Sequence, residues 1–267
     1  SYQCTAVIYD TDGNEYPVSY WNSSSEAVLT DGRVITFSKG TITYTENGVE
    51  KTATMKDYEV KGIKYVPVKV KTSDLEALKE KYKDQIHIAL GLEFEYYESH
   101  LEELKQYKND MDYMLLGQHD ACLYGKDFYT HSSDEDILEY ASLIEKACEK
   151  ELPDIIAHPD LFMFGKEEWN ETCEKAAHII CKSAEKHHVY LEINLNGLRY
   201  GKRQLGKEYR YTYPYRKFWE IASQYDVKCI YGLDAHKPEK YADEECYHIV
   251  DEILKDIPLQ KEKMLIL

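Results

Sequence analysis

Carboxylate and imidazole side chains follow apolar runs at several points of the chain. The clearest case is the segment CIYGLDAHKPE, in which Asp234 and His236 come directly after an apolar run. Earlier apolar runs end in Glu93, His119 and His158 in the same way. Carboxylate and imidazole groups are ligands for Zn²⁺, Mn²⁺ and Fe²⁺. If the fold brings the ends of these runs together, the five residues form a transition-metal site.

The pattern after residue 70 predicts such a fold. Short apolar runs alternate with segments of helical period, which is typical of parallel βαβ units. The predicted strands are 86–93, 112–119, 154–160, 189–196 and 227–236, with helices near 98–108, 133–150, 167–187, 215–225 and 243–255. In a parallel β/α barrel the carboxyl ends of all strands converge on one face, where the chemistry collects. We therefore expect an α/β fold, with part of a β/α barrel over residues 71–267.

Residues 1–70 follow a different pattern. Alternating runs such as AVIYD and TITYT are separated by Asp-Gly and Asn-Gly pairs, which are strong signals of β-hairpins. We expect a small antiparallel β module of about five or six strands. It has no histidine, since the first one in the chain is His87. A structural or interaction role is the simplest interpretation of this module.

The totals exclude some classes of function. A formal net charge of −16 argues against nonspecific nucleic-acid binding, which needs clustered Lys and Arg. No apolar run approaches the length of a membrane span, about 18 residues. The seven cysteines are scattered and include no C-x-x-C pair. This pattern predicts reduced thiols and a cytoplasmic protein.

Arg199 stands out in this acidic chain. It ends the run EINLNGLR, which leaves a predicted strand and turns at Gly197. An arginine fork at the mouth of a metal site suits a phosphate monoester. On spacing alone, a surface salt bridge explains the residue equally well.

Several motifs together resemble the histidinol-phosphate phosphatases of the polymerase-and-histidinol-phosphatase (PHP) superfamily. They cover about residues 72–255 and are, in chain order, GLEFEYY, DYMLLGQHD, IIAHPDLF, EINLNGLR with the later YPY, and GLDAH. The resemblance implies a distorted β/α barrel of the PHP type with a cluster of Zn, Fe or Mn ions. It also implies hydrolysis of a small phosphorylated substrate by metal-activated water. The family reaction converts histidinol phosphate and water to histidinol and phosphate, in histidine biosynthesis.

The same motifs imply roles for individual residues. Glu93 would be a bridging metal ligand, and His119 and His158 would be further ligands. Asp234 and His236 would be ligands with a catalytic role. Arg199 resembles the phosphate-contacting arginine of the family.

The chain also departs from the family pattern at its start. The family opens with an H-x-H strand, and no H-x-H occurs in this sequence. We therefore expect fewer metal ions than the family's three. Three explanations fit this departure from the family pattern. The chain could be a remodelled member of the family, or its site could be completed by another subunit or by a separate N-terminal fragment. The third explanation is a truncated enzyme joined to a foreign N-terminus. Two alternative functions are open. One is a non-catalytic binding or scaffold protein, and the other is a phosphatase that acts on another small phosphate ester.

Overall fold

The structure of the chain is a computed structural model, which describes residues 3–9, 14–23, 26–36, 41–54, 62–68, 72–122, 126–235, 240–241 and 243–263. The chain divides into two compact units, Ser1–Leu78 and Lys79–Leu267. The prediction from the sequence was 1–70 and 71–267. Helix α1 (Thr72–Tyr82) contains the boundary between the two units.

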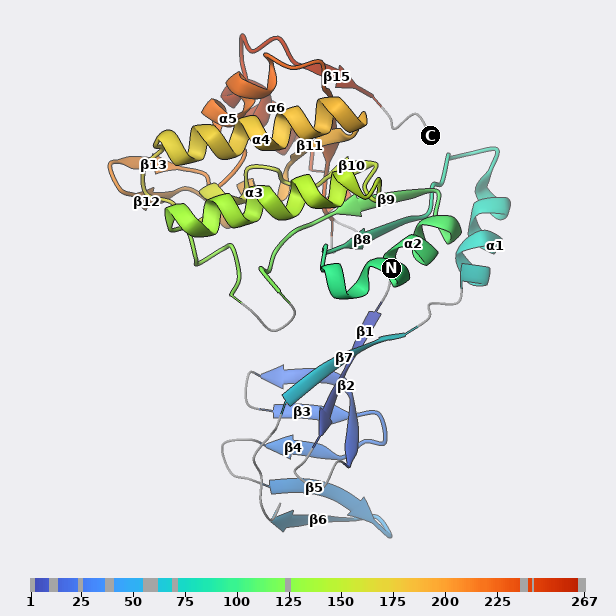
Figure 1. Cartoon of the computed structure of the whole chain (residues 1–267). Coiled ribbons are helices and arrows are strands. Elements are labelled where there is room, and N and C mark those ends of the chain that lie inside the picture. The colour runs from blue at the N-terminus through green and yellow to red at the C-terminus, as the bar shows by residue number, and fades with distance from the viewer. Residues whose placement is uncertain are drawn as a thin grey trace. The chain divides into compact units, whose positions relative to one another are not determined.

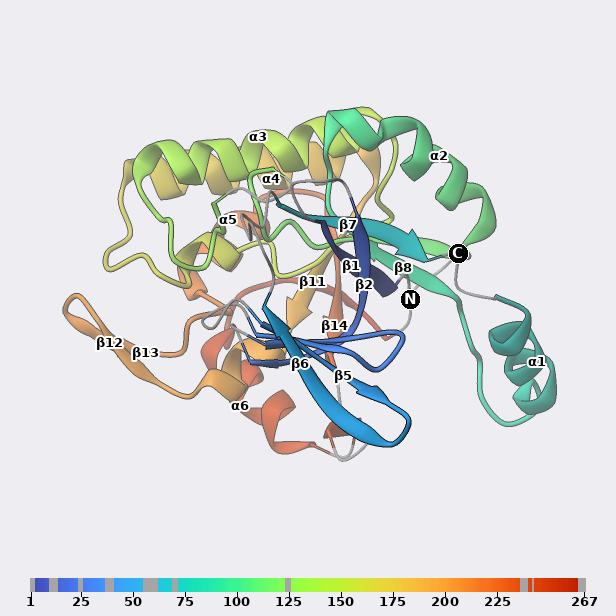
Figure 2. The same cartoon turned by 90° about the horizontal axis from the view of Figure 1, so that it is seen from below.

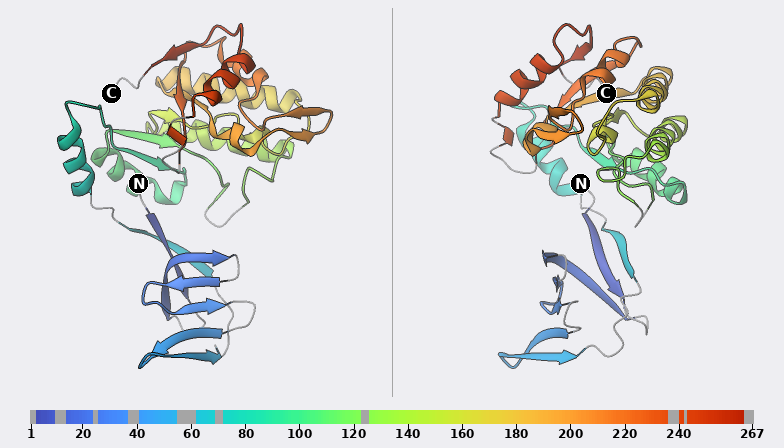
Figure 3. Two further views of the ribbon diagram at one scale, coloured as in Figure 1. Left: turned by 180° about the vertical axis from the view of Figure 1, so that it is seen from behind. Right: turned by 90° about the vertical axis from the view of Figure 1, so that its left-hand side faces the viewer.

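The first unit contains one antiparallel sheet of seven strands, in the order β6-β5-β4-β3-β2-β1-β7. Figure 3 shows these strands as a ladder. The strands are β1 (Gln3–Tyr9), β2 (Glu15–Ser23), β3 (Glu26–Leu29), β4 (Val34–Thr36), β5 (Thr41–Glu46), β6 (Val49–Thr54) and β7 (Gly62–Val68). The antiparallel character agrees with the prediction, and the strand number exceeds the expected five or six.

Local sequence explains both the turns and the core of this unit. Asn47 and Gly48 join β5 to β6 with positive φ angles of 54° and 77°, the conformation that an Asn-Gly hairpin turn requires. Alternate residues of the strands point to one face and form a small apolar core. This core consists of Ile8, Val18, Ala27, Leu29, Ile35 and Ile42.

The second unit is built on a sheet of six parallel strands, in the order β15-β14-β11-β10-β9-β8. The strands are β8 (Gly91–Phe94), β9 (Tyr113–Leu116), β10 (Ile155–Ile156), β11 (Tyr190–Asn194), β14 (Lys228–Gly232) and β15 (Gln260–Glu262). All five residues of β11 are buried, as expected for a central strand that is covered on both faces. Because the strands are parallel, their carboxyl ends lie along one edge of the sheet.

Helices connect these strands and cover the sheet. They are α2 (Leu101–Asp110), α3 (Asp134–Glu149), α4 (Glu171–His187), α5 (Arg216–Ala222) and α6 (Glu245–Ile253), with the short 3₁₀ helices η2 (Glu98–His100), η3 (Leu161–Met163) and η4 (Asn196–Tyr200). Figures 1 and 2 show α3 and α4 side by side across one face of the sheet. A capping box between Ser133 and Asp136 starts α3, and Asn170 caps α4.

The structure contains all five predicted parallel strands, in shorter form, and adds elements that the sequence did not indicate. Strand β15 pairs with β14. The hairpin of β12 (Arg203–Leu205) and β13 (Glu208–Arg210) extends from the unit, as Figures 1 and 2 both show. The fold is mixed α/β, with one parallel and one larger antiparallel sheet. Pairing between β8 and β15, which would close a barrel, is not found among the described strands.

One negative finding concerns membranes. Among the described helices, none combines the length and the apolar character that crossing a bilayer requires.

Candidate metal centre

Three of the predicted metal ligands meet at the carboxyl edge of the parallel sheet. Glu93 lies in β8, His119 follows β9, and His158 follows β10. One ligand atom from each residue lies within 4.8 Å of the other two. These strands are neighbours in the sheet, so the parallel order itself brings the three side chains together.

The spacing of the ligand atoms fits a divalent metal. The two Nε2 atoms of His119 and His158 are 3.1 Å apart, and Oε1 of Glu93 lies 3.8 Å and 4.0 Å from them, respectively. Ligand atoms around a tetrahedral Zn²⁺ with bonds of about 2.0–2.2 Å lie roughly 3.3–3.6 Å apart. The distance between the two Nε2 atoms is slightly shorter than this range, and the two distances to Oε1 of Glu93 are slightly longer. Two imidazoles and one carboxylate are also a donor set that Zn²⁺, Mn²⁺ and Fe²⁺ accept.

The two histidines differ in their electrostatic environment. Burial lowers the pKa of His158 well below its usual value, and nearby His119 lowers it further, so this imidazole is neutral and can bind a metal. Burial also disfavours the charged form of His119. However, the hydrogen bond to Glu95 and the charges of Glu95 and Glu93 outweigh that effect and raise the pKa of His119.

Glu95 orients His119 and was not predicted as part of the site. Its Oε1 lies 3.5 Å from Nδ1 of His119, while its Oε2 accepts a hydrogen bond from the backbone N–H of Asp120 at 3.0 Å. A carboxylate on the second ring nitrogen is a common partner of metal-binding histidines. The alternation Glu93-Phe94-Glu95 in the sequence was the available signal for this residue.

Gly117 leaves room for the Glu93 carboxylate. A Cβ atom at this position would lie 2.3 Å from Oε1 of Glu93 and 3.0 Å from Cε1 of His119. Any other residue at this point would therefore displace the carboxylate from its present position.

His158 has an unusual backbone conformation. Its φ angle of 29° lies in the left-handed region, which non-glycine residues rarely adopt and which costs on the order of 1–3 kcal/mol. Asp234, another predicted ligand at a strand end, also has a positive φ angle, of 45°. Residues held in such conformations are often found at functional sites.

A polar network lies beside the three residues. Oδ2 of Asp234 accepts hydrogen bonds from Nδ2 of Asn196 at 3.0 Å and from Nδ2 of Asn194 at 3.4 Å. Nη1 of Arg199 donates to Oδ1 of Asn196 at 3.2 Å and to the backbone oxygen of Asp234 at 3.0 Å. Glu192, next to this network, is buried, and burial raises its pKa to about 7.

The predicted site residues therefore fall into three groups. Glu93, His119 and His158 form one ligand group. Asp234 and Arg199 lie in the neighbouring polar network, outside that group. His236 lies outside the described residues.

Arg199 retains hydrogen-bonding capacity. Its Nε and Nη2 atoms are buried and have no hydrogen-bond partner within the described part of the chain. These two atoms form one side of the guanidinium fork, which is suited to two oxygens of a phosphate.

Aromatic rings surround the ligand group. Tyr129 stacks on the His119 ring with centroids 5.6 Å apart, and Tyr213 lies 6.0 Å from the His158 ring. Phe164 contacts Tyr129 edge-on at 4.9 Å and Tyr200 at 5.1 Å. These rings keep water from part of the site, which strengthens electrostatic interactions there.

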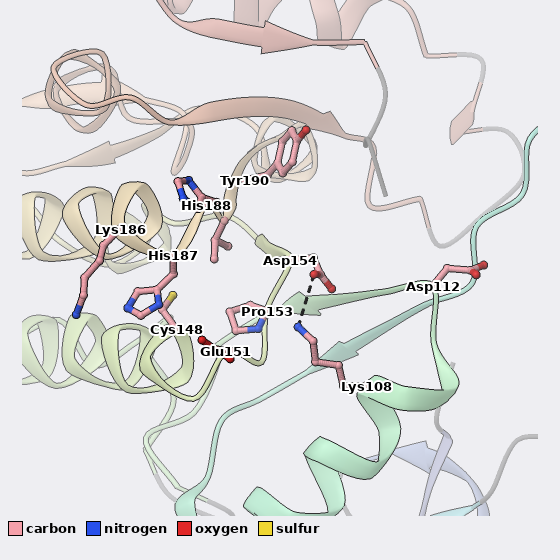
Figure 4. Close-up of a pocket in the computed structure, with 11 residues that line it drawn as sticks. Lys108, Asp112, Cys148, Glu151, Pro153, Asp154, Lys186, His187, His188 and Tyr190 are labelled. Atoms are coloured by element: carbon pink, nitrogen blue, oxygen red, sulfur yellow. Dashed lines mark ion pairs between the residues drawn. The ribbon is translucent and has the colours of Figure 1, made fainter.

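A separate pocket lies at the amino ends of β9, β10 and β11 and has a volume of about 460 Å³ (Figure 4). Lys108 and Asp154, which line it, form an ion pair at 3.6 Å. Asp154 also accepts a hydrogen bond from the backbone N–H of Met114 at 2.7 Å. The pocket is thus at the opposite end of the strands from the candidate metal ligands, and Asp154 links its lining to the backbone of β9.

Comparison with solved structures identifies the fold of this arrangement. Histidinol phosphate phosphatase (HisK) of Lactococcus lactis subsp. lactis Il1403, solved with Zn, L-histidinol and phosphate, is similar to the chain with a TM-score of 0.55 and 15% sequence identity. The similarity covers 76% of this chain and 80% of the phosphatase chain. The two proteins share a fold. At this low identity the likeness shows the fold alone, and the relation is distant.

Other comparisons add less. The family model for penicillin-binding protein Tp47 domain a matches residues 1–91, which include the antiparallel sheet. A chain in an archaeal ribonuclease P with mature tRNA is 13% identical, covering 74% of this chain and 85% of that chain, at a TM-score of 0.43. That score is too low to support an argument. No curated protein matches the chain.

Proposed function

We propose that the second unit is a metal-dependent phosphatase that acts on a small phosphate monoester. The observation that carries this proposal is the group of Glu93, His119 and His158 at the carboxyl ends of three neighbouring parallel strands. In this proposal Asp234 and His236 complete the ligand set. The centre then holds fewer than three ions of Zn, Mn or Fe, since the chain has no H-x-H strand.

Different residues of the site have different roles in the proposed reaction. A divalent cation bound here would neutralise charge on the phosphoryl group and activate water for its attack. Arg199 binds the phosphate through Nε and Nη2, the two atoms that have no hydrogen-bond partner among the described residues. Glu95 fixes the ring of His119, so that Nε2 faces the centre. The aromatic rings around the histidines limit the access of bulk water.

Histidinol phosphate is the substrate that we propose first. The structural neighbour was solved with histidinol and phosphate, the two products of its hydrolysis. The EINLNGLR segment that places Arg199 is one of the motifs that resemble this family. Another small phosphate ester is the alternative substrate for the same site.

The rest of the architecture is also part of the proposal. We propose that the parallel sheet is a portion of a PHP-type β/α barrel, and that residues 1–70 form a module with a separate role. The missing ligands of the barrel would come from a second copy of the chain or from a complementing N-terminal fragment.

The experiment is a measurement of metal content and phosphate release with the full chain. We expect one or more transition-metal ions per chain and release of phosphate from histidinol phosphate. Asp234→Ala and His236→Ala should each abolish the release. His248→Ala, which removes an exposed histidine of α6, is the matched control and should have no effect. Unchanged rates in both site variants would refute the assignment.

A non-catalytic metal-binding or scaffold protein is the second candidate. It is favoured by the small size of the ligand group, which contains three residues within the described part of the chain. Metal binding without turnover of histidinol phosphate or of any other phosphate ester would support this candidate over the phosphatase.

A further inference from the structure

Glu192 is a buried carboxylate in the middle of β11 that faces the candidate metal centre without belonging to its ligand group. Its side chain is almost inaccessible, at 6% residue exposure. Its Oε2 atom accepts a hydrogen bond from the backbone N–H of His158 at 3.1 Å and another from Nδ2 of Asn194 at 2.9 Å. A buried carboxylate is costly for a fold unless such bonds compensate it.

The bond to His158 holds a residue in a conformation that it would not adopt by itself. His158 has a φ angle of 29°, and the residues around it must maintain this angle. On its other side, the hydroxyl of Tyr140 donates a hydrogen bond to the backbone oxygen of His158 at 3.1 Å. Both main-chain polar groups of His158 are thus fixed by buried side chains, one from β11 and one from α3.

The position of the imidazole depends on this backbone. Nδ1 of His158 is buried and has no hydrogen-bond partner among the residues described, so the ring itself is not fixed by a polar contact on that side. Nε2 faces His119 and Glu93. The orientation of Nε2 therefore comes from the main chain of His158, from packing, and from the 3.1 Å contact with Nε2 of His119.

We propose that Glu192 is a positioning residue of the metal centre, which acts through the backbone of His158 and not as a ligand, with Tyr140 as its counterpart. The inference rests on the proposed metal centre. Through Asn194, whose Nδ2 also lies 3.4 Å from Asp234, the same carboxylate connects the two parts of the site. Residues that support metal ligands in this way contribute about 10- to 100-fold to metal affinity.

Gly232 gives this carboxylate its space. A Cβ atom at position 232, on the neighbouring strand β14, would lie 1.6 Å from Oε1 of Glu192. No side chain fits there unless Glu192 moves. Glycine at this point of the strand is explained by the closeness of the Glu192 carboxylate.

The test is the Zn²⁺ affinity of the full chain, measured by competition with a chromophoric chelator. We expect Glu192→Ala to weaken Zn²⁺ binding about 10- to 100-fold. Glu192→Gln should remain within about threefold of the wild type, because the amide oxygen can accept both hydrogen bonds. The absorption spectrum of bound Co²⁺ should change in Glu192→Ala and not in Glu192→Gln.

Asp154→Ala is the matched control. This carboxylate also accepts a backbone N–H bond, from Met114, but at the amino end of the sheet. We expect a lower melting temperature and an unchanged Zn²⁺ affinity. Tyr140→Phe removes a hydroxyl only, and should weaken Zn²⁺ binding about 3- to 10-fold, so it tests the proposal even if Glu192→Ala fails to fold.

Two results would overturn the positioning role. The first is a wild-type Zn²⁺ affinity in both Glu192→Ala and Tyr140→Phe. If Glu192→Ala does not fold, a wild-type affinity in Tyr140→Phe is sufficient. The second is an equal loss in Asp154→Ala. A wild-type protein that binds Zn²⁺ but releases no phosphate would refute the phosphatase, while the affinities would still decide the role of Glu192. A wild-type protein that binds no Zn²⁺ would refute both.

Discussion

Gly117→Ala is a small change that probes the metal centre through its geometry. The new Cβ atom would lie 2.3 Å from Oε1 of Glu93, whereas ordinary contacts begin near 3.4 Å. The φ angle of Gly117 is not in the left-handed region, so alanine causes no backbone strain there. The Glu93 side chain is 46% exposed and can rotate towards solvent. The variant should therefore fold, with its carboxylate displaced.

The distance by which the Glu93 carboxylate must move determines how much Zn²⁺ affinity is lost. To reach an ordinary contact, the carboxylate oxygen must move by about 1 Å. Metal sites tolerate deviations of only about 0.2 Å in ligand distance. We therefore expect Zn²⁺ affinity to fall at least about 10-fold. The melting temperature should change by less than about 3 °C, because the clash is relieved by a side chain at the surface.

A double-mutant cycle with Glu93→Ala identifies the cause. If Gly117→Ala acts mainly through the carboxylate, it should weaken Zn²⁺ binding in the wild type and have a much smaller effect in Glu93→Ala, where only the 3.0 Å contact with Cε1 of His119 remains. Isothermal titration of the four proteins with Zn²⁺ measures this directly. A wild-type affinity in Gly117→Ala, or an equal loss in both backgrounds, would show that the Glu93 carboxylate does not bind the metal.

Three further predictions also concern the second unit. Arg199→Ala should raise the KM for the phosphate ester about 10- to 100-fold in steady-state kinetics, since a charge-assisted hydrogen bond contributes about 1.5–3 kcal/mol; an unchanged KM would place the phosphate elsewhere. Zn²⁺ at about 100 times its Kd should stabilise the protein by about 2.7 kcal/mol and raise its melting temperature by about 5–10 °C; a shift of the same size in His119→Ala would contradict the site. Burial raises the pKa of Asp136, but hydrogen bonds from Lys126 and Ser133 outweigh this and lower it to about 2. Its contribution to stability is therefore complete above pH about 4 and is lost as the pH falls towards 2; Asp136→Asn should remove this part of the pH dependence in urea unfolding, and an identical profile would exclude the contribution.

The sequence was sufficient to predict the strands that place the candidate metal ligands. Apolar runs that end in Glu93, His119 and His158 correspond to β8, β9 and β10, because short apolar runs that alternate with helical segments are typical of parallel βαβ units. The convergence of these residues then followed from the parallel order alone.

Other features could not be predicted for physical reasons. Strand β15 consists of Gln260, Lys261 and Glu262, and a polar edge strand has no apolar pattern. The β12–β13 hairpin is also mostly polar, and none of its strand residues is buried. The role of Glu192 depends on a main-chain contact to His158, 34 positions away, which no local pattern encodes.

The most direct test of the metal centre is the anomalous scattering of crystals soaked in Zn²⁺. We expect a zinc peak about 2.0–2.2 Å from Oε1 of Glu93 and from Nε2 of both His119 and His158. The absence of zinc between these three residues, or zinc bound only at other sites, would contradict this expectation.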